Sequence, residues 1–331
     1  MEYKIKKAAV LGAGVMGAQI AAHLANAGVP CYLLDIVPKD LKEGESRSKL
    51  ALMAIENLKR AKPSPIIGKE VLTMITPGNF EDDFEKVKDA DWIIEAVVEN
   101  LEIKKNLLKK VEQFAHSKAI VSSNTSGLSI NKMVEECSDD FKKRFLGTHF
   151  FNPPRYMKLF EIVPNKKTES EVVNFIAKFA ENRLGKGVVY CKDTVNFIGN
   201  RIGVYAVANT IKTMMEMGLS ISEVDAATGP VLGRPKTATF RTADLVGVDI
   251  LYHVAKNVYD YAPDDECREE FLLPDFVKKM IENGWLGNKT GQGFYKKVKK
   301  EIFSTGWIVS LVVHPDENNP LPPVDVSVRE N

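Results

Sequence analysis

The sequence predicts an α/β protein in which a doubly wound, Rossmann-type sheet is followed by an all-helical second domain. Up to about residue 195, short apolar runs bounded by turn residues alternate with helical patterns, as in a parallel sheet covered on both faces. From Phe197 onward only helical spacing remains. We therefore expect a first domain at 1–195 with a helical insert near 39–76, a helical domain at 196–300, and an atypical, poorly anchored tail at 301–331.

Composition and charge exclude several classes of partner. The 331 residues suit one large or two medium-sized domains and contain ample apolar content for their cores. Lys and Arg number 45 against 44 Asp and Glu, a formal net charge of +1, so a general attraction to nucleic acid or anionic membrane is not expected. We expect neither nucleic acid nor a membrane as a partner.

Cysteine usage argues against a metal site. The four cysteines are far apart, form no C-x-x-C pair and have no histidine at ligand spacing; they are Cys31, Cys137, Cys191 and Cys267. The N-terminal apolar run is too short for a signal peptide, and no later run approaches membrane-spanning length. We expect a reducing compartment, the cytoplasm, and no metal.

The first predicted element is a strand, glycine turn and helix that together form a dinucleotide-binding unit. Residues 7–11 are a buried-strand pattern, and AQIAAHLANAG at 18–28 has helical spacing that ends at Gly28 in a left-handed stop. The turn between them is G-x-G-x-x-G, and we expect it to bind the cofactor through Gly12, Gly14, Val15, Met16 and Gly17. Its glycines allow the backbone to approach a pyrophosphate at the positive end of the helix.

The second predicted strand, at 29–35, indicates which dinucleotide binds. It ends in Asp35, roughly 20 residues beyond Gly12, where an acidic side chain binds the adenine-ribose hydroxyls. A carboxylate repels a 2′-phosphate, and the next residues, Ile36 and Val37, carry no cation, although Lys39 is near. NAD is therefore expected rather than NADP.

The rest of the first domain continues the alternation after a charged insert. By composition the insert is a solvated hairpin; the alternative is a lid that meets a phosphorylated substrate through Arg47, Lys49, Lys59 and Arg60. Five further strands are expected, at 91–97, 118–123, 144–150, 158–163 and 186–191.

Polar residues follow three of these strands and predict one crevice. They are Glu99 and Asn100, then the run Ser123-Asn124-Thr125-Ser126, then His149 and Asn152. In doubly wound sheets ligands bind beyond the carboxyl ends of the strands, so these side chains should converge there.

A lone glutamate, Glu161, lies in the apolar run 159–163, where an ionised carboxylate needs a partner. The turn signal Asn152-Pro153-Pro154 should fold 158–163 back along 144–150, so that a turn centred near Arg155 places Glu161 opposite His149. A carboxylate that orients the ring and favours imidazolium makes a general base. An isolated pair would more often be structural, but a nicotinamide crevice beside a base is what alcohol oxidation requires.

Five motifs in order resemble the L-3-hydroxyacyl-CoA dehydrogenases of fatty acid β-oxidation: LGAGVMG, EAVVENLEIK, SSNTSGLSI, GTHFFNPPRYMKLFEIV and CKDTVNFIGNRI. The resemblance covers residues 5 to about 296. It implies that His149 is the base and Glu161 its partner, while Ser126 and Asn200 hold the substrate oxygen. It also implies nicotinamide-side positions at Ala96, Glu99, Lys104 and Asn152.

Local alternatives exist for two of these residues: Ser126 as the N-cap of a helix over LSINKMVEE, and Asn200 as a polar residue in the first turn of a helix.

The helical domain has broad apolar faces. We expect it to close over the substrate and to form a homodimer, as in the family, rather than act as a cap without dimerisation. Residues 193–196 are expected to form the interdomain joint.

Three features depart from the family's usual pattern. The joint reads DTVNF where Pro-Gly is common, and residues 228–249 look like a subgroup with an enoyl-CoA hydratase behind the dehydrogenase, for which this chain has no room. The tail 301–331 resembles no family element, and we expect a chain ending at Lys300 to keep full activity.

The sequence therefore predicts reversible, NAD-dependent oxidation of a (3S)-3-hydroxyacyl-CoA to the 3-ketoacyl-CoA. One alternative is a dehydrogenase of a free hydroxy or sugar acid on the same fold. Two others are a non-catalytic cofactor-binding protein and an inactive fragment of the fused enzyme.

Overall fold

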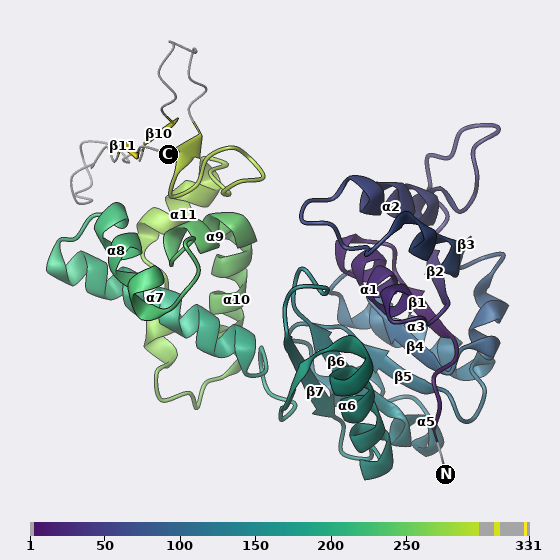
Figure 1. Ribbon diagram of the computed structural model, residues 1–331. Coiled ribbons are helices and arrows are strands. Elements are labelled where there is room, and N and C mark those ends of the chain that lie inside the picture. The colour runs from purple at the N-terminus through teal and green to yellow at the C-terminus, as the bar shows by residue number, and fades with distance from the viewer. Residues whose placement is uncertain (1–2, 298–307, 312–327, 330–331) are drawn as a thin grey trace. The chain divides into compact units, whose positions relative to one another are not determined.

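The computed structural model describes residues 3–297, 308–311 and 328–329. The chain forms two compact units that divide between Ile198 and Gly199 (Figure 1). Each unit is described by itself.

The first unit is built on one eight-stranded sheet in the order β3-β2-β1-β4-β5-β6-β7-β8. Its strands are β1 (Ala8–Leu11), β2 (Cys31–Asp35), β3 (Ile75–Asn79), β4 (Trp92–Glu95), β5 (Ile120–Ser123), β6 (Phe145–Phe150), β7 (Leu159–Pro164) and β8 (Gly187–Tyr190). Strands β1 to β6 are parallel, β7 pairs antiparallel with β6, and β8 is parallel to β7. The predicted doubly wound sheet is confirmed.

Helices cover both faces of this sheet (Figure 1). They are α1 (Val15–Asn26), α2 (Lys49–Arg60), α3 (Leu101–Phe114), α4 (Ile130–Met133), α5 (Asp139–Lys143), α6 (Ser170–Leu184) and the 3-10 helices η1 (Lys69–Met74) and η2 (Phe84–Asp89). Because strand side chains alternate, Ala8 and Val10 pack with α1, α2 and α6, whereas Ala9 and Leu11 pack with α3, α4 and α5. The central strands β1, β4, β5 and β6 are buried at every residue. Because β1 to β6 are parallel, their carboxyl ends lie at one edge of the sheet.

Strand β3 was not predicted, because residues up to 76 were assigned to the helical insert. Its sequence contains Pro77 and Gly78, which are poor strand formers. The strand lies at the edge of the sheet and pairs only with β2, a position in which proline is tolerated. Tertiary pairing therefore overrides the local sequence preference.

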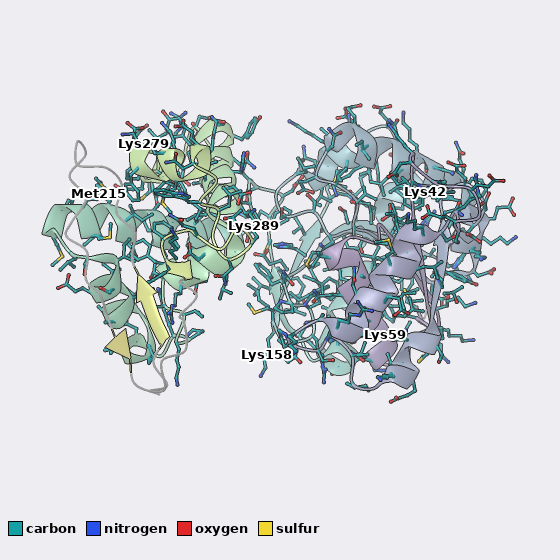
Figure 2. All side chains as sticks on the ribbon, turned by 90° about the horizontal axis from the view of Figure 1, so that it is seen from above. Lys42, Lys59, Lys158, Met215, Lys279 and Lys289 are labelled. Carbon is teal, nitrogen blue, oxygen red and sulfur yellow. The ribbon has the colours of Figure 1, made fainter. Side chains whose placement is uncertain are left out.

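The insert contains one α-helix, α2, and the 3-10 helix η1, while 36–48 is irregular. Arg47 pairs with Glu81 and Asp82, Lys49 with Glu45, and Lys59 with Glu56. Lys42 and Lys59 lie on the surface of this region (Figure 2). Three of the four basic residues considered for a phosphate-binding lid are thus engaged by neighbouring carboxylates, which favours the solvated hairpin.

The second unit begins with a long helix. Its elements are α7 (Gly199–Met217), α8 (Ile221–Thr228), η3 (Pro230–Leu232), α9 (Phe240–Val246), α10 (Val248–Tyr261), η4 (Arg268–Phe271), α11 (Asp275–Glu282), β9 (Lys296–Lys297), β10 (Ile308–Leu311) and β11 (Val328–Arg329). Helix α7 is followed by Gly218, which has φ +66°. Gly247, whose φ is +112°, separates α9 from α10. The predicted helical domain is confirmed, with these short strands in addition.

Residues 193–197 belong to the first unit, where we expected the joint. The Asp193 carboxylate accepts hydrogen bonds from the Ser129 hydroxyl and from the backbone N–H groups of Ile130 and Asn131, at 2.8–2.9 Å. Phe197 is buried in the core of this unit. The Asp193 side chain thus stabilises the start of α4.

The predictions for the tail 301–331 fall, apart from β10 and β11, outside the described residues. Within the parts of the chain that the structure describes, no helix has both the length and the apolar character needed to cross a bilayer.

Candidate active site

The glycine turn after β1 forms an open cradle at the start of α1. Gly12 has φ +110°, and a Cβ there would lie 2.5 Å from the Ala96 carbonyl oxygen; a Cβ on Gly17 would lie 1.9 Å from the Gly12 oxygen. A Cβ on Gly14 would meet open space. Two glycines are therefore needed for close backbone packing, and the third leaves room at a helix N-terminus. This is the arrangement that a dinucleotide pyrophosphate requires.

Asp35 lies beside that turn, at the end of β2. One carboxylate oxygen accepts a hydrogen bond from the Ala13 backbone N–H at 2.5 Å, and the other accepts from the Ile36 N–H at 2.7 Å. Val15 and Ile36 expose apolar side chains next to it, and Met16 is partly buried. The carboxylate is oriented by the turn itself, in the position where ribose hydroxyls bind in this fold.

The end of β4 carries a buried ion pair that was not predicted. Lys104 Nζ of α3 lies 2.7 Å from Glu95 Oε1 and 3.2 Å from Glu99 Oε2. Glu95 is fully buried and Lys104 is 1% exposed, so the ammonium lies beneath Glu99. Ala96 follows Glu95 and packs its backbone against Gly12.

Glu99 links β4 to the loop after β5. It accepts hydrogen bonds from the Thr125 hydroxyl at 2.6 Å and from the Ser126 backbone N–H and hydroxyl at 2.9 and 3.2 Å. Burial alone would raise the pKa of Glu99, but the Lys104 cation and these hydrogen bonds hold it below its ordinary value. Glu99 is therefore an anion that fixes the Ser126 side chain.

Ser126 is not the helix N-cap considered as its local alternative. Helix α4 begins at Ile130, and Ser129 is the residue whose side chain accepts from the Lys132 N–H. Ser126 lies three residues before that cap, in the loop that contacts Glu99.

His149 and Glu161 face each other across β6 and β7. They are register partners, and His149 Nδ1 lies 2.7 Å from Glu161 Oε2. Both side chains are buried, with His149 5% and Glu161 0% exposed. The second Glu161 oxygen accepts from the Ile198 backbone N–H at 3.0 Å, and the Phe151 ring lies 4.4 Å from the imidazole. Glu161 thus holds the ring by Nδ1 and leaves Nε2 as the nitrogen directed away from it.

Three asparagines were also predicted near the site. Asn124 Oδ1 accepts from the Phe150 backbone N–H at 2.9 Å and so ties the end of β5 to β6, while Asn152 is exposed in the turn after β6. Asn200 lies in the first turn of α7, in the second unit, as its local alternative predicted.

Three links therefore join four neighbouring strands at the carboxyl edge of the parallel strands: Glu99–Ser126, Asn124–Phe150 and His149–Glu161. Ser123, predicted as part of the polar run after β5, donates to Glu95 beneath this edge, whereas Glu95 itself was not predicted. The signal was available, because Glu95 interrupts the apolar run DWIIEAV just as Glu161 interrupts its own.

Comparison with known proteins matches both units. Residues 7–194 match the model of the 3-hydroxyacyl-CoA dehydrogenase NAD-binding domain, and residues 197–297 match that of the family's C-terminal domain. The first match identifies NAD as the cofactor, in agreement with the cradle and Asp35.

Among curated relatives, a probable 3-hydroxyacyl-CoA dehydrogenase of Bacillus subtilis is 55% identical over 92% of this chain and 40% of its own length. A protein of the same description from Deinococcus radiodurans is 49% identical over 90% of this chain and 84% of its own length. The chain thus spans about two fifths of the Bacillus relative.

Among solved structures, the (S)-3-hydroxybutyryl-CoA dehydrogenase of Ralstonia eutropha is 26% identical, with a TM-score of 0.74 over 89% of this chain and all of the other. The 3-hydroxybutyryl-CoA dehydrogenase of Escherichia coli is 25% identical, with the same TM-score over 93% of this chain and 66% of the other. The chain therefore belongs to the 3-hydroxyacyl-CoA dehydrogenase family, of which it carries the NAD-binding and the C-terminal domain.

Proposed function

We propose that this protein catalyses the reversible, NAD-dependent oxidation of a (3S)-3-hydroxyacyl-CoA to the 3-ketoacyl-CoA in fatty acid β-oxidation. The observation that carries the proposal is the 2.7 Å contact between His149 Nδ1 and Glu161 Oε2, buried at the same sheet edge as the glycine cradle. An alcohol becomes a ketone when its hydroxyl proton and its carbon-bound hydrogen, as hydride, leave together. NAD, when bound, supplies the hydride acceptor.

His149 is the general base in this proposal. Its Nε2 takes the proton of the 3-hydroxyl group, and in the reverse direction returns it to the 3-keto oxygen. Glu161 Oε2 accepts from Nδ1–H, which sets the tautomer and stabilises the imidazolium by a buried opposite charge. Burial keeps water from competing for the base and strengthens this interaction.

Ser126 and Asn200 are proposed to hold the substrate oxygen. The Ser126 hydroxyl is fixed by Glu99, so it can present a hydrogen-bonding group without a loss of side-chain freedom at the moment of binding. Asn200, with donors and acceptors in the first turn of α7, would bring a second contact from the C-terminal domain. Ala96, Glu99, Lys104 and Asn152 are assigned to the nicotinamide side of the site.

We also propose that the protein forms a homodimer through its helical domain. Helices of the second unit expose large apolar side chains, among them Ile202 and Met217 on α7 and Val231 in η3; Met215, also on α7, is visible in Figure 2. We propose that these side chains form part of the dimer interface, because contiguous exposed apolar surface marks protein-interaction sites. A dimeric mass in sedimentation at micromolar concentration is the expected result, and a monomer would refute the dimer.

The test is NADH absorbance with acetoacetyl-CoA, measured beside free acetoacetate and beside NADPH. We expect rapid oxidation only with the CoA ester and NADH. Turnover of the free acid would instead indicate a hydroxy-acid dehydrogenase. Failure to oxidise NADH that demonstrably binds would refute the substrate assignment.

A further inference from the structure

Two charged side chains lie buried beneath the candidate site, and the proposed reaction assigns no step to them. Glu95 is 0% and Lys104 1% exposed. Removing two ions from water costs more than their attraction returns unless further hydrogen bonds satisfy them. A hydrophobic pair would be an adequate core, so the ionic pair needs a reason beyond packing.

Glu95 organises the ends of two strands at once. Its Oε1 accepts from the Val97 backbone N–H and from Lys104 Nζ, both at 2.7 Å. Its Oε2 accepts from the Ser123 hydroxyl at 2.5 Å, and that hydroxyl oxygen accepts from the Thr125 N–H at 3.1 Å. The chain directions at the ends of β4 and β5 are therefore set by one carboxylate.

Lys104 connects the buried Glu95 to the more exposed Glu99. Besides Glu95, its ammonium contacts the Val97 carbonyl oxygen and Glu99 Oε2, each at 3.2 Å. The Glu99 side chain is 41% exposed, and Lys104 is the cation that fixes its Oε2. Held by Lys104 through Oε2, it binds the Ser126 N–H and hydroxyl through Oε1.

We propose that Glu95 is a positioning residue, which fixes Lys104 and through it Glu99, and so places the Ser126 hydroxyl for the substrate oxygen. The inference rests on the proposed function, because the position of Ser126 affects turnover only if Ser126 contacts the substrate. It also reassigns Lys104 from direct contact with the cofactor to support of Glu99 from below.

The charge of Lys104 has a second consequence at Glu99. The charged groups that face Glu99 are Lys104 from α3 and, behind it, Glu95 from β4; the hydroxyls of Thr125 and Ser126 face it from the next loop. Lys104 lowers the pKa of Glu99 and so keeps it an acceptor for both hydroxyls at lower pH. Without Lys104, two facing carboxylates remain and Glu99 takes up a proton more readily.

Four variants separate positioning from general stability. Glu95→Gln keeps the shape and removes the negative charge, Lys104→Met removes the positive charge, and the double variant removes both. The matched control is Asn165→Ala, at the opposite end of β6, which loses three hydrogen bonds of a buried side chain. Its Nδ2 donates to the Lys142 and Phe145 carbonyl oxygens, and its Oδ1 accepts from the Lys167 N–H.

Three measurements are made on each full-length variant: the melting temperature, kcat for NADH oxidation with acetoacetyl-CoA over pH 5–9, and hydrogen exchange of the peptide that covers 120–130. We expect each single variant to lower kcat by about 10- to 100-fold, as a misplaced contact does. The acidic limb of the Lys104→Met profile should move to higher pH, and amides of the 120–130 peptide should exchange faster.

The double variant gives the sharpest outcome. Because no uncompensated buried charge remains, its melting temperature should recover toward that of the wild type, while kcat should stay low because Glu99 has lost its anchor. Asn165→Ala should melt earlier but keep its kcat, its acidic limb and the exchange of 120–130. Recovery of stability and kcat together in the double variant, or wild-type exchange in both single variants, would overturn the proposal. If the wild type itself leaves acetoacetyl-CoA unchanged, the proposed function has failed, and the exchange of 120–130 still decides whether Glu95 positions Ser126.

Discussion

Two buried glutamates determine how the candidate site is built. Glu161 and Glu95 each interrupt an apolar strand, and each has a cation or an imidazole as its partner within 2.7 Å. An ionised carboxylate out of water costs several kcal/mol unless it is paired, so neither position is neutral for stability. Their shared location at the carboxyl edge of the sheet ties that cost to the site.

Glu161→Gln tests the role of the first glutamate. A glutamine still accepts from the Ile198 N–H and reaches His149, so the hairpin should fold, but it cannot stabilise an imidazolium. We expect slower turnover and a shifted pH profile of kcat with acetoacetyl-CoA, at unchanged NADH affinity. A profile that superimposes on the wild type would make Glu161 a structural residue only.

The pairing of His149 with Glu161 was predictable, whereas the network under Ser126 was not. An antiparallel hairpin has a side-chain period of two, so a turn centred near Arg155 places these residues opposite each other. The contacts of Lys104 join α3 to β4 and depend on how the helix packs, which no local pattern encodes. The helix start at Ser129 rather than Ser126 was missed for a similar reason, since Asp193 from a distant segment fixes it.

At the scale of elements, the strand–turn–helix unit was predicted most completely. Its three glycines have different structural roles: Gly12 has a positive φ, Gly17 approaches the Gly12 backbone, and Gly14 faces open space. Period-two alternation and the G-x-G-x-x-G spacing are both local, so sequence suffices for them. Strand β3 forms because it pairs with β2, although it contains Pro77. Its local sequence therefore did not predict a strand.

Alanine substitutions in the turn should have distinct effects. Gly14 has φ −65°, which any residue adopts, so Gly14→Ala should keep the melting temperature while its methyl group occupies the cradle. We expect NADH affinity to fall by about tenfold or more. Gly17→Ala places a methyl group 1.9 Å from a backbone oxygen and should lower both stability and binding. Wild-type NADH affinity in Gly14→Ala, measured by fluorescence titration, would place the pyrophosphate elsewhere.

At the scale of the molecule, the chain consists of two units with separate cores. The first contains the cradle, the His149–Glu161 pair and Ser126, and Asn200 lies in the second. The change from alternating to purely helical periodicity identified both units from sequence. The end of the first was harder to place, because Phe197 looks like the start of the helical pattern but packs into the first core.

A fragment of residues 1–198 tests whether the first unit alone binds NADH and whether turnover needs the second. It retains the whole sheet and both helical layers, so we expect a cooperative melt and NADH binding close to that of the full chain. Turnover of acetoacetyl-CoA should be lost, since Asn200 and the C-terminal domain are absent. Turnover within a fewfold of the full chain would remove the second unit from the reaction.

The proposed mechanism depends above all on proton transfer by His149, and the decisive variant is His149→Gln. The measurement is kcat with acetoacetyl-CoA and NADH, together with NADH affinity and melting temperature, beside His116→Gln, which changes a histidine just before the amino-terminal end of β5. We predict that His149→Gln lowers kcat by ~10²-fold or more with NADH binding and folding retained, and that His116→Gln does not. A near-normal kcat in His149→Gln would remove His149 from the mechanism.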